Sequence, residues 1–116
     1  MGSPEALRFA SMFGALGHES RLEALRLLLR AHPHGMVAGE LQEELGIPAS
    51  TLSHHLDALR REGLIEQVRE GRFLRYAVAT ESLKDLLGFL YAECCGGRCG
   101  AVIEFPLPVA AVQARA

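Results

Sequence analysis

The chain has 116 residues, and its hydrophobic fraction of 49% excludes an intrinsically disordered protein. A single domain of this size buries about two-thirds of its unfolded surface, so a second subunit would help its stability. Its net charge of −2 argues weakly against a nucleic-acid partner, because such domains are usually basic. No apolar run reaches the length of a membrane span, and MGSPEALRF does not resemble a signal peptide, so we expect a cytoplasmic protein.

The first part of the chain predicts two amphipathic helices. Helical spacing marks the first, which should end near Gly14 to Gly17. The second should begin at Ser20, where SRLE has the form of a capping box with Glu23, and HPHG at 32–35 should stop it. The predicted apolar stripes are Ala6, Phe9, Ala10 and Phe13 in the first helix, and Leu22, Leu25, Leu28 and Leu29 in the second.

Two further short helices follow, separated by a tight turn. The earlier one closes at Gly46, and the later one starts after Pro48, a residue tolerated in a first helical turn, and ends at Gly63. Their apolar stripes are Val37, Ala38, Leu41 and Leu45, and then Leu52, His55, Leu56 and Leu59. Two short helices joined in this way predict a helix-turn-helix.

The remaining segments predict a hairpin, a last helix and a tail. LIEQV and RFLRYAVA flank REGR, which predicts two strands with a turn at Glu70-Gly71. A helix should run from about Thr80 to Ala92, with an apolar side formed by Leu83, Leu86, Leu87 and Leu90. The fold class is therefore mainly α (α+β): a winged helix-turn-helix with about five helices and a two-stranded wing. Residues 1–100 should form the DNA-binding and dimerisation domain with a C-terminal cysteine site, and residues 101–116 an extended tail.

One face of the helix after Pro48 is suited to reading DNA. Short hydroxyls and an imidazole near a helix N-terminus can reach base edges and phosphates, and arginines at a hairpin tip can enter the minor groove. Asp57 opposes phosphate binding, although it could accept a hydrogen bond from a cytosine amino group, and His55 lies on the apolar side as a core histidine. The alternative is that these side chains are merely solvent-exposed on the helix and the hairpin and do not contact DNA. The predicted DNA contacts are Ser50, Thr51, Ser53, His54, Arg69, Arg72 and Arg75.

The segments ALGHESRLEALRLL, ELGIPASTLSHHLDALRREGLI and REGRFLRYAV resemble the signatures of the ArsR/SmtB family of metal-responsive repressors. The resemblance covers about residues 9–79, and STLSHHLDALRREGL is its most specific part. It implies a homodimer built through the first and last helices, and double-stranded operator DNA that is released when an inducer ion binds. Two departures stand out: His18-Glu19 replaces the usual Asp-Pro type of pair, and Asp57 stands where lysine is common.

All three cysteines, Cys94, Cys95 and Cys99, lie within six positions. Gly96 and Gly97 between them allow the chain to fold back, so that three thiolates can converge. Zinc and iron–sulfur sites ordinarily need a fourth ligand, whereas As(III) takes three sulfurs. The sequence therefore predicts As(III) as the inducer, with Sb(III) and methylarsenite close behind. Some family members similarly respond to arsenite through a C-terminal cysteine cluster, whereas GMVAGELQEEL lacks the family's other cysteine motif.

Two other functions use the same cysteines. A redox-sensing repressor would form a Cys94–Cys99 or Cys95–Cys99 disulfide, and a small arsenate reductase would use Cys94 or Cys95 as its nucleophile. The chain has no phosphate-cradling loop beside these cysteines, and GGRCG alone is weak evidence for one. We therefore expect a regulator and no enzyme, with redox sensing as the main alternative to arsenite sensing. The remaining alternative is that the three cysteines are incidental surface residues without a function.

Overall fold

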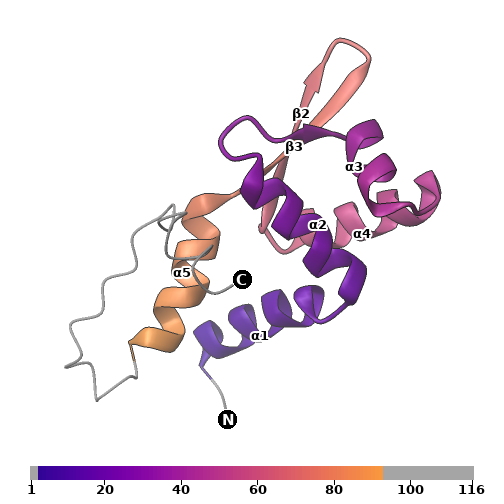
Figure 1. The fold of residues 1–116 in the computed structure, drawn as a ribbon. Helices are drawn as coiled ribbons and strands as arrows, with labels where there is room; N and C mark the ends of the chain where they lie inside the picture. Colours follow the sequence, from indigo (N-terminus) through magenta and orange to yellow (C-terminus); the bar gives the residue numbers. More distant parts are fainter. Residues whose placement is uncertain (1–2, 93–116) are drawn as a thin grey trace, which may run out of the picture. The chain divides into compact units, whose positions relative to one another are not determined.

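The computed structural model describes residues 3–92. Residues up to Ala79 fall in one compact unit, and the last described helix belongs to a second. The first unit contains helices α1 (Pro4–Leu16), α2 (Glu19–Arg30), α3 (Ala38–Leu45) and α4 (Ala49–Arg61), with strands β1 (Met36–Val37), β2 (Ile65–Glu70) and β3 (Phe73–Val78). Helix α5 is Thr80–Tyr91. This order confirms the predicted winged helix-turn-helix (Figure 1).

Helix α1 has the predicted extent but a different buried face. Ser3 caps it by accepting a hydrogen bond from the Ala6 amide at 3.1 Å. The predicted stripe was wrong in part, because Ala10 and Phe13 are exposed. Apolar residues lie on more than one side of this helix, so their spacing allows two stripes, and packing on α2 and α4 decides between them. The buried residues are Phe9, Met12 and Ala15.

Helix α2 begins one residue earlier than the capping-box pattern predicts. His18 is its N-cap, and the imidazole Nδ1 accepts a hydrogen bond from the Ser20 amide at 3.3 Å. Because His18 satisfies this amide, Ser20 lies within the helix and Glu23 pairs with Arg26 at 2.7 Å instead. The prediction for Leu22 was also wrong, since its side chain is exposed. The buried residues of α2 are Ala24, Leu25 and Leu28.

The helix-turn-helix follows its predicted boundaries closely. Gly46 ends α3 in the left-handed region at φ 65°, and Gly63 follows α4 at φ 73°. Val37, expected in the helix, lies in β1, and its amide donates a hydrogen bond to the Glu40 carboxylate at 3.1 Å. Gly35, just before β1, also has positive φ, at 77°. Each of these three glycines therefore takes a backbone conformation that would be strained for a residue with a side chain.

The sheet has three strands in the order β1-β3-β2, one strand more than predicted. Met36 pairs with Tyr76 and Val37 with Arg75, so β1 joins the hairpin to the start of α3. Two residues are too few for a period of two to be visible in the sequence, which explains the missed strand.

The hairpin turn lies one residue later than predicted. Glu70 pairs with Phe73, which leaves Gly71 and Arg72 as the two central residues. Gly71 takes φ 63° at the first central position, where a two-residue hairpin turn requires a positive φ. Arg72 therefore stands at the tip of the wing. Figure 1 shows this hairpin projecting beyond the helices of its unit.

The core of the first unit combines side chains from all four of its helices and from the root of the wing. Its largest members, each almost completely buried, are Met12, Leu28, Leu41, Leu56, Leu59, Leu64 and Ile65. In α5, Leu83 and Leu86 are buried as predicted, whereas Leu90 is exposed. No helix among residues 3–92 is both long and apolar enough to span a membrane. Cys94, Cys95, Cys99 and the predicted tail lie outside the described residues.

Candidate nucleic-acid interface

Helix α4 has one buried face and one exposed face. Leu52, Leu56 and Leu59 are almost completely buried, and they hold the helix against the core. The opposite face begins in the first helical turn, where amide groups point outward and favour an anion. Side chains predicted to read DNA are all exposed on this helix: Ser50, Thr51, Ser53 and His54. The structure therefore presents them together on the surface of the second helix of the helix-turn-helix.

His55 is the core histidine that the sequence predicts. Only 6% of the residue is exposed, and its Nδ1 accepts a hydrogen bond from Nε of Arg21 at 3.1 Å. Its ring centroid lies 4.5 Å from that of His18. Burial is the main cause that lowers the pKa of His55, followed by repulsion from His18, Arg21 and His54. The lowered pKa and the hydrogen bond accepted at Nδ1 both favour the neutral imidazole with its proton on Nε2.

A chain of polar contacts joins α4 to the wing. Arg60 donates a hydrogen bond to the Gln67 amide oxygen at 3.2 Å, and the Gln67 amide nitrogen donates to the Tyr76 hydroxyl at 2.8 Å. Arg60 also pairs with Asp57 at 3.4 Å, and both side chains are about half exposed, so this pair is weak. Arg60 still offsets some of the negative charge that Asp57 brings to the exposed face. The sequence does not predict these contacts between α4 and the wing, because only the i,i+3 spacing of Asp57 and Arg60 can be read from it.

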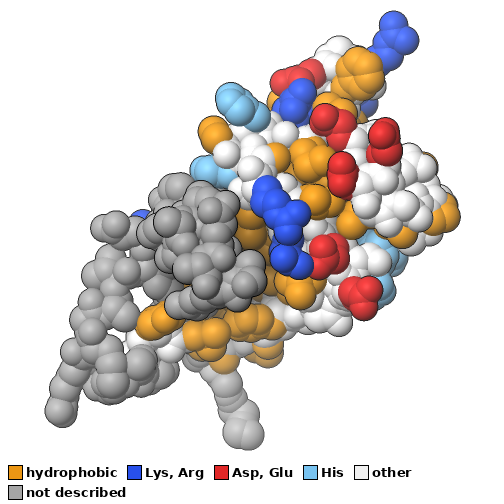
Figure 2. Space-filling view, in the orientation of Figure 1, with side chains coloured by type: hydrophobic (Ala, Val, Ile, Leu, Met, Phe, Trp, Pro, Cys, Tyr) orange, Lys and Arg blue, Asp and Glu red, His pale blue; other side chains and the backbone are white. Residues whose placement is uncertain are grey.

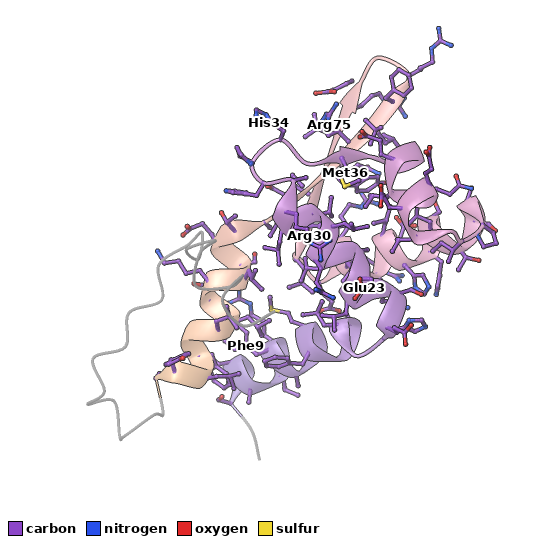
Figure 3. The ribbon with its side chains drawn as sticks, viewed as in Figure 1. Phe9, Glu23, Arg30, His34, Met36 and Arg75 are labelled. Carbon is purple, nitrogen blue, oxygen red and sulfur yellow. The ribbon has the colours of Figure 1, made fainter. Side chains whose placement is uncertain are left out.

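The three arginines of the wing fall into two groups. Arg69 and Arg72 are exposed at the tip. Arg75 is half-buried, pairs with Glu70 at 2.8 Å and donates a hydrogen bond to the Gly35 carbonyl at 3.5 Å. Figure 3 shows Arg75 near the segment in which the loop with His34 leads into β1 at Met36. Arg75 therefore braces the wing against this loop, whereas Arg69 and Arg72 are available to a ligand.

Acidic side chains gather on α3, near the basic end of the wing. Figure 2 shows basic side chains at the end of the wing and acidic side chains grouped beside them. The acidic side chains on α3 are Glu40, Glu43 and Glu44, all exposed. These carboxylates would repel DNA phosphates, so α4 and the wing tip are the elements suited to a nucleic acid.

Metal binding within the described residues has no structural support. No group of three or more His, Cys, Asp or Glu side chains among residues 3–92 is arranged to hold a metal ion. The three cysteines predicted to bind As(III) lie beyond this part of the chain.

An exposed polar face on α4, a basic wing tip and the fold together define a winged helix-turn-helix DNA-binding regulator. A family model described as a helix-turn-helix domain matches residues 16–68. YgaV of Escherichia coli, a helix-turn-helix transcriptional regulator, is 33% identical over 86 residues, which cover 74% of this chain and 85% of the relative. The transcriptional repressor SdpR of Bacillus subtilis is 30% identical over 69% of this chain and 86% of its own. The transcriptional activator HlyU of Vibrio cholerae is 32% identical over 70% of this chain and 72% of its own.

Similar solved structures identify the family more closely. An ArsR-like transcriptional regulator from Rhodococcus sp. RHA1 superposes with a TM-score of 0.70 at 30% identity, covering 81% of this chain and 86% of the other. A second similar structure is the homodimeric winged helix-turn-helix domain Mb0332 of Mycobacterium bovis, described as a possible ArsR-family regulator. It superposes with a TM-score of 0.62 at 25% identity, covering 87% of this chain and 96% of the other. The chain belongs to the ArsR/SmtB family of transcriptional regulators.

Proposed function

We propose that the chain is an arsenite-responsive repressor that binds operator DNA as a homodimer. In this proposal, Cys94, Cys95 and Cys99 bind As(III) as thiolates, and the operator is then released. The observation that carries the DNA-binding part is the exposed stripe of α4, backed by a buried leucine face. The cluster of three cysteines just beyond the end of α5 at Tyr91 carries the inducer part.

Exposed apolar side chains on α1 and α5 support the proposed dimer. Leu7 on α1 is 70% exposed and Leu90 on α5 is 53% exposed, with Phe13 and Tyr91 also open to solvent. Exposed apolar side chains that gather into one patch mark surfaces that another subunit covers. A homodimer through the first and last helices would bury them. The two copies of α4 would then lie roughly 34 Å apart, on successive turns of an inverted repeat.

The proposed release follows from the position of the cysteines. If three thiolates close together after α5, the end of this helix must move, and the proposed dimer contact must move with it. The spacing of the two α4 helices then no longer fits the operator. Allosteric coupling of this kind is typically about 1–3 kcal/mol, and effective release requires the upper end, about a hundredfold change in affinity.

The test is fluorescence anisotropy with a labelled duplex that the wild-type protein selects from a random-sequence pool. Arsenite should weaken binding by about a hundredfold, and each Cys→Ser variant should bind the duplex normally but ignore arsenite. About one arsenic per subunit, and no zinc, should accompany the release. Wild-type protein that keeps its duplex at saturating arsenite would show that the inducer assignment is wrong.

Redox sensing is the second candidate, because neighbouring thiols can form a disulfide. It predicts that peroxide or diamide releases the duplex and that dithiothreitol restores binding, whereas arsenite has no effect under reducing conditions. Adding the oxidant and arsenite separately to the same samples therefore distinguishes the two regulators.

A further inference from the structure

The wing tip carries an exposed aromatic side chain. Phe73 is 58% exposed and Val68 is 55% exposed. Because Glu70 pairs with Phe73 and Val68 with Arg75, all four residues lie on one face of the hairpin. Phe73 directly follows the Gly71-Arg72 turn, far from the buried root of the wing. Its ring is more exposed than a structural role in the core would require.

Charge around this aromatic ring favours an anionic partner. Arg72 in the turn and Arg69 on β2 are both exposed, and Arg69, which pairs with Leu74, lies on the face of the hairpin opposite to Phe73. Glu70, the acid opposite Phe73, is paired with Arg75 at 2.8 Å, so these two charges largely cancel. The wing tip therefore combines an apolar ring with two exposed arginines. Figure 2 shows hydrophobic and basic side chains side by side at this end of the molecule.

A second copy of the chain is a poor match for this tip. A specific protein interface buries about 1,200–2,000 Å², whereas the exposed apolar surface here consists of two side chains. Arginines from two tips would also repel each other at close range. DNA next to the exposed face of α4 fits both features, because its minor groove attracts arginine and accepts apolar side chains.

We propose that Phe73 is an apolar wedge that enters the minor groove and partly unstacks one base step. Arg72, next to Phe73 in the turn, and Arg69, on the opposite face of the hairpin, hold the phosphates on the two sides of the wing tip. This inference rests on the DNA-binding part of the proposed function, and it assigns a specificity determinant that base contacts from α4 do not supply. Pyrimidine–purine steps are the easiest to unstack, so the wing should prefer a TA or CA step in the outer part of each half-site.

The salt dependence of DNA binding distinguishes the contribution of the Phe73 ring from that of the arginines. Phe73→Ala should weaken binding to the selected duplex by about tenfold, because stacking on a base is lost. Its slope of log affinity against log salt should equal that of the wild type, since no phosphate contact is removed. Arg72→Ala should instead reduce the magnitude of this slope by about one. Phe73→Ala with wild-type affinity would overturn the wedge.

Unstacking itself is measured with 2-aminopurine placed at the proposed step. Its fluorescence should rise when the wild-type protein binds and should stay low with Phe73→Ala. Phe73→Leu keeps an apolar wedge and should restore most of the signal. Replacing the flexible step by a stiff A-tract step should cost the wild type more affinity than it costs Phe73→Ala. Equal losses in the two proteins would contradict the assigned specificity.

Leu74 provides the matched control. It is the next residue on β3, is apolar and points to the opposite face of the hairpin. Leu74→Ala should leave the 2-aminopurine signal unchanged, and an equal loss in both variants would show that the hairpin, not the ring, is responsible. If the wild type binds no duplex at all, the DNA-binding function and the wedge both fail. If only the response to arsenite is missing, the inducer assignment fails and the wedge stands.

Discussion

The Nε of Arg21 donates a hydrogen bond to the Nδ1 of His55 across 3.1 Å and thereby joins α2 to the buried side of α4. The exposed side of α4 carries the serines and His54 that we expect to contact DNA. This bond therefore helps to fix α4, the helix that we propose to read DNA, through its buried side.

Arg21→Ala should destabilise the protein by about 1–3 kcal/mol, because the buried Nδ1 of His55 would lose its donor. Urea denaturation followed by circular dichroism measures this loss. Arg26→Ala is the control on the same helix, since Arg26 forms an exposed pair with Glu23. It should change stability by no more than about 0.5 kcal/mol. Similar losses for the two variants would contradict a special role for the Arg21–His55 bond.

Stability should fall below the ordinary pKa of histidine because of His55. The fold lowers the pKa of this imidazole, chiefly through burial. At a pH below about 6.5 the unfolded chain therefore binds a proton that the folded chain excludes. The contribution of His55 is complete above this pH and is lost as the pH falls towards the lower pKa of the folded state.

His55→Gln provides the comparison for this pH dependence, because a neutral amide oxygen can still accept from Arg21. Urea denaturation of both proteins, repeated from neutral pH into the acidic range, measures it. The stability advantage of the wild type over the variant should shrink as the pH falls. A constant difference across the range would contradict the assignment to His55.

Gly35→Ala should destabilise the protein by more than about 1 kcal/mol. Gly35 has φ 77°, and a Cβ there would overlap the carbonyl oxygen of Tyr76 on β3. Gly39→Ala is the matched control, because a Cβ on this exposed residue of α3 would meet no atom within 4 Å. It should stabilise the helix by about 0.5–1 kcal/mol. Thermal melts of the two variants should therefore shift in opposite directions.

Tyr76→Phe should cost about 0.5–1.5 kcal/mol, since it removes the hydroxyl that accepts from Gln67 at 2.8 Å. Gln67→Ala should cost a similar amount, and the double variant should cost less than the sum, because the two side chains share one bond. Denaturation of the four proteins gives this coupling. Tyr91→Phe, on a half-exposed side chain of α5, is the control and should leave stability nearly unchanged.

Local signals in the sequence predicted α4 well. Pro48 before the helix, the leucine spacing and Gly63 after it agree with one another, and the structure places each as expected. The exposure of Ser50 and the burial of His55 follow from the same period. These features need no knowledge of the tertiary fold, because each depends on residues within one helix.

Other features depend on residues that are distant in the sequence. The buried face of α1 is decided by α2 and α4, so the predicted Phe13 stripe was wrong and Met12 is buried instead. The role of Arg75 depends on Gly35, which lies forty residues earlier and accepts its hydrogen bond. No periodicity carries such information. The roles of the cysteines and the DNA-contacting residues stay predictions.

Pairing between β1 and β3 has a consequence for protein engineering. A chimera that receives only the hairpin of a relative would place a foreign strand against the native Met36, Val37 and Gly35. These residues contact β3 through backbone pairing and through a close approach that tolerates no side chain. A wing transplant that changes operator preference should therefore carry residues 35–37 together with residues 65–78 as one cassette.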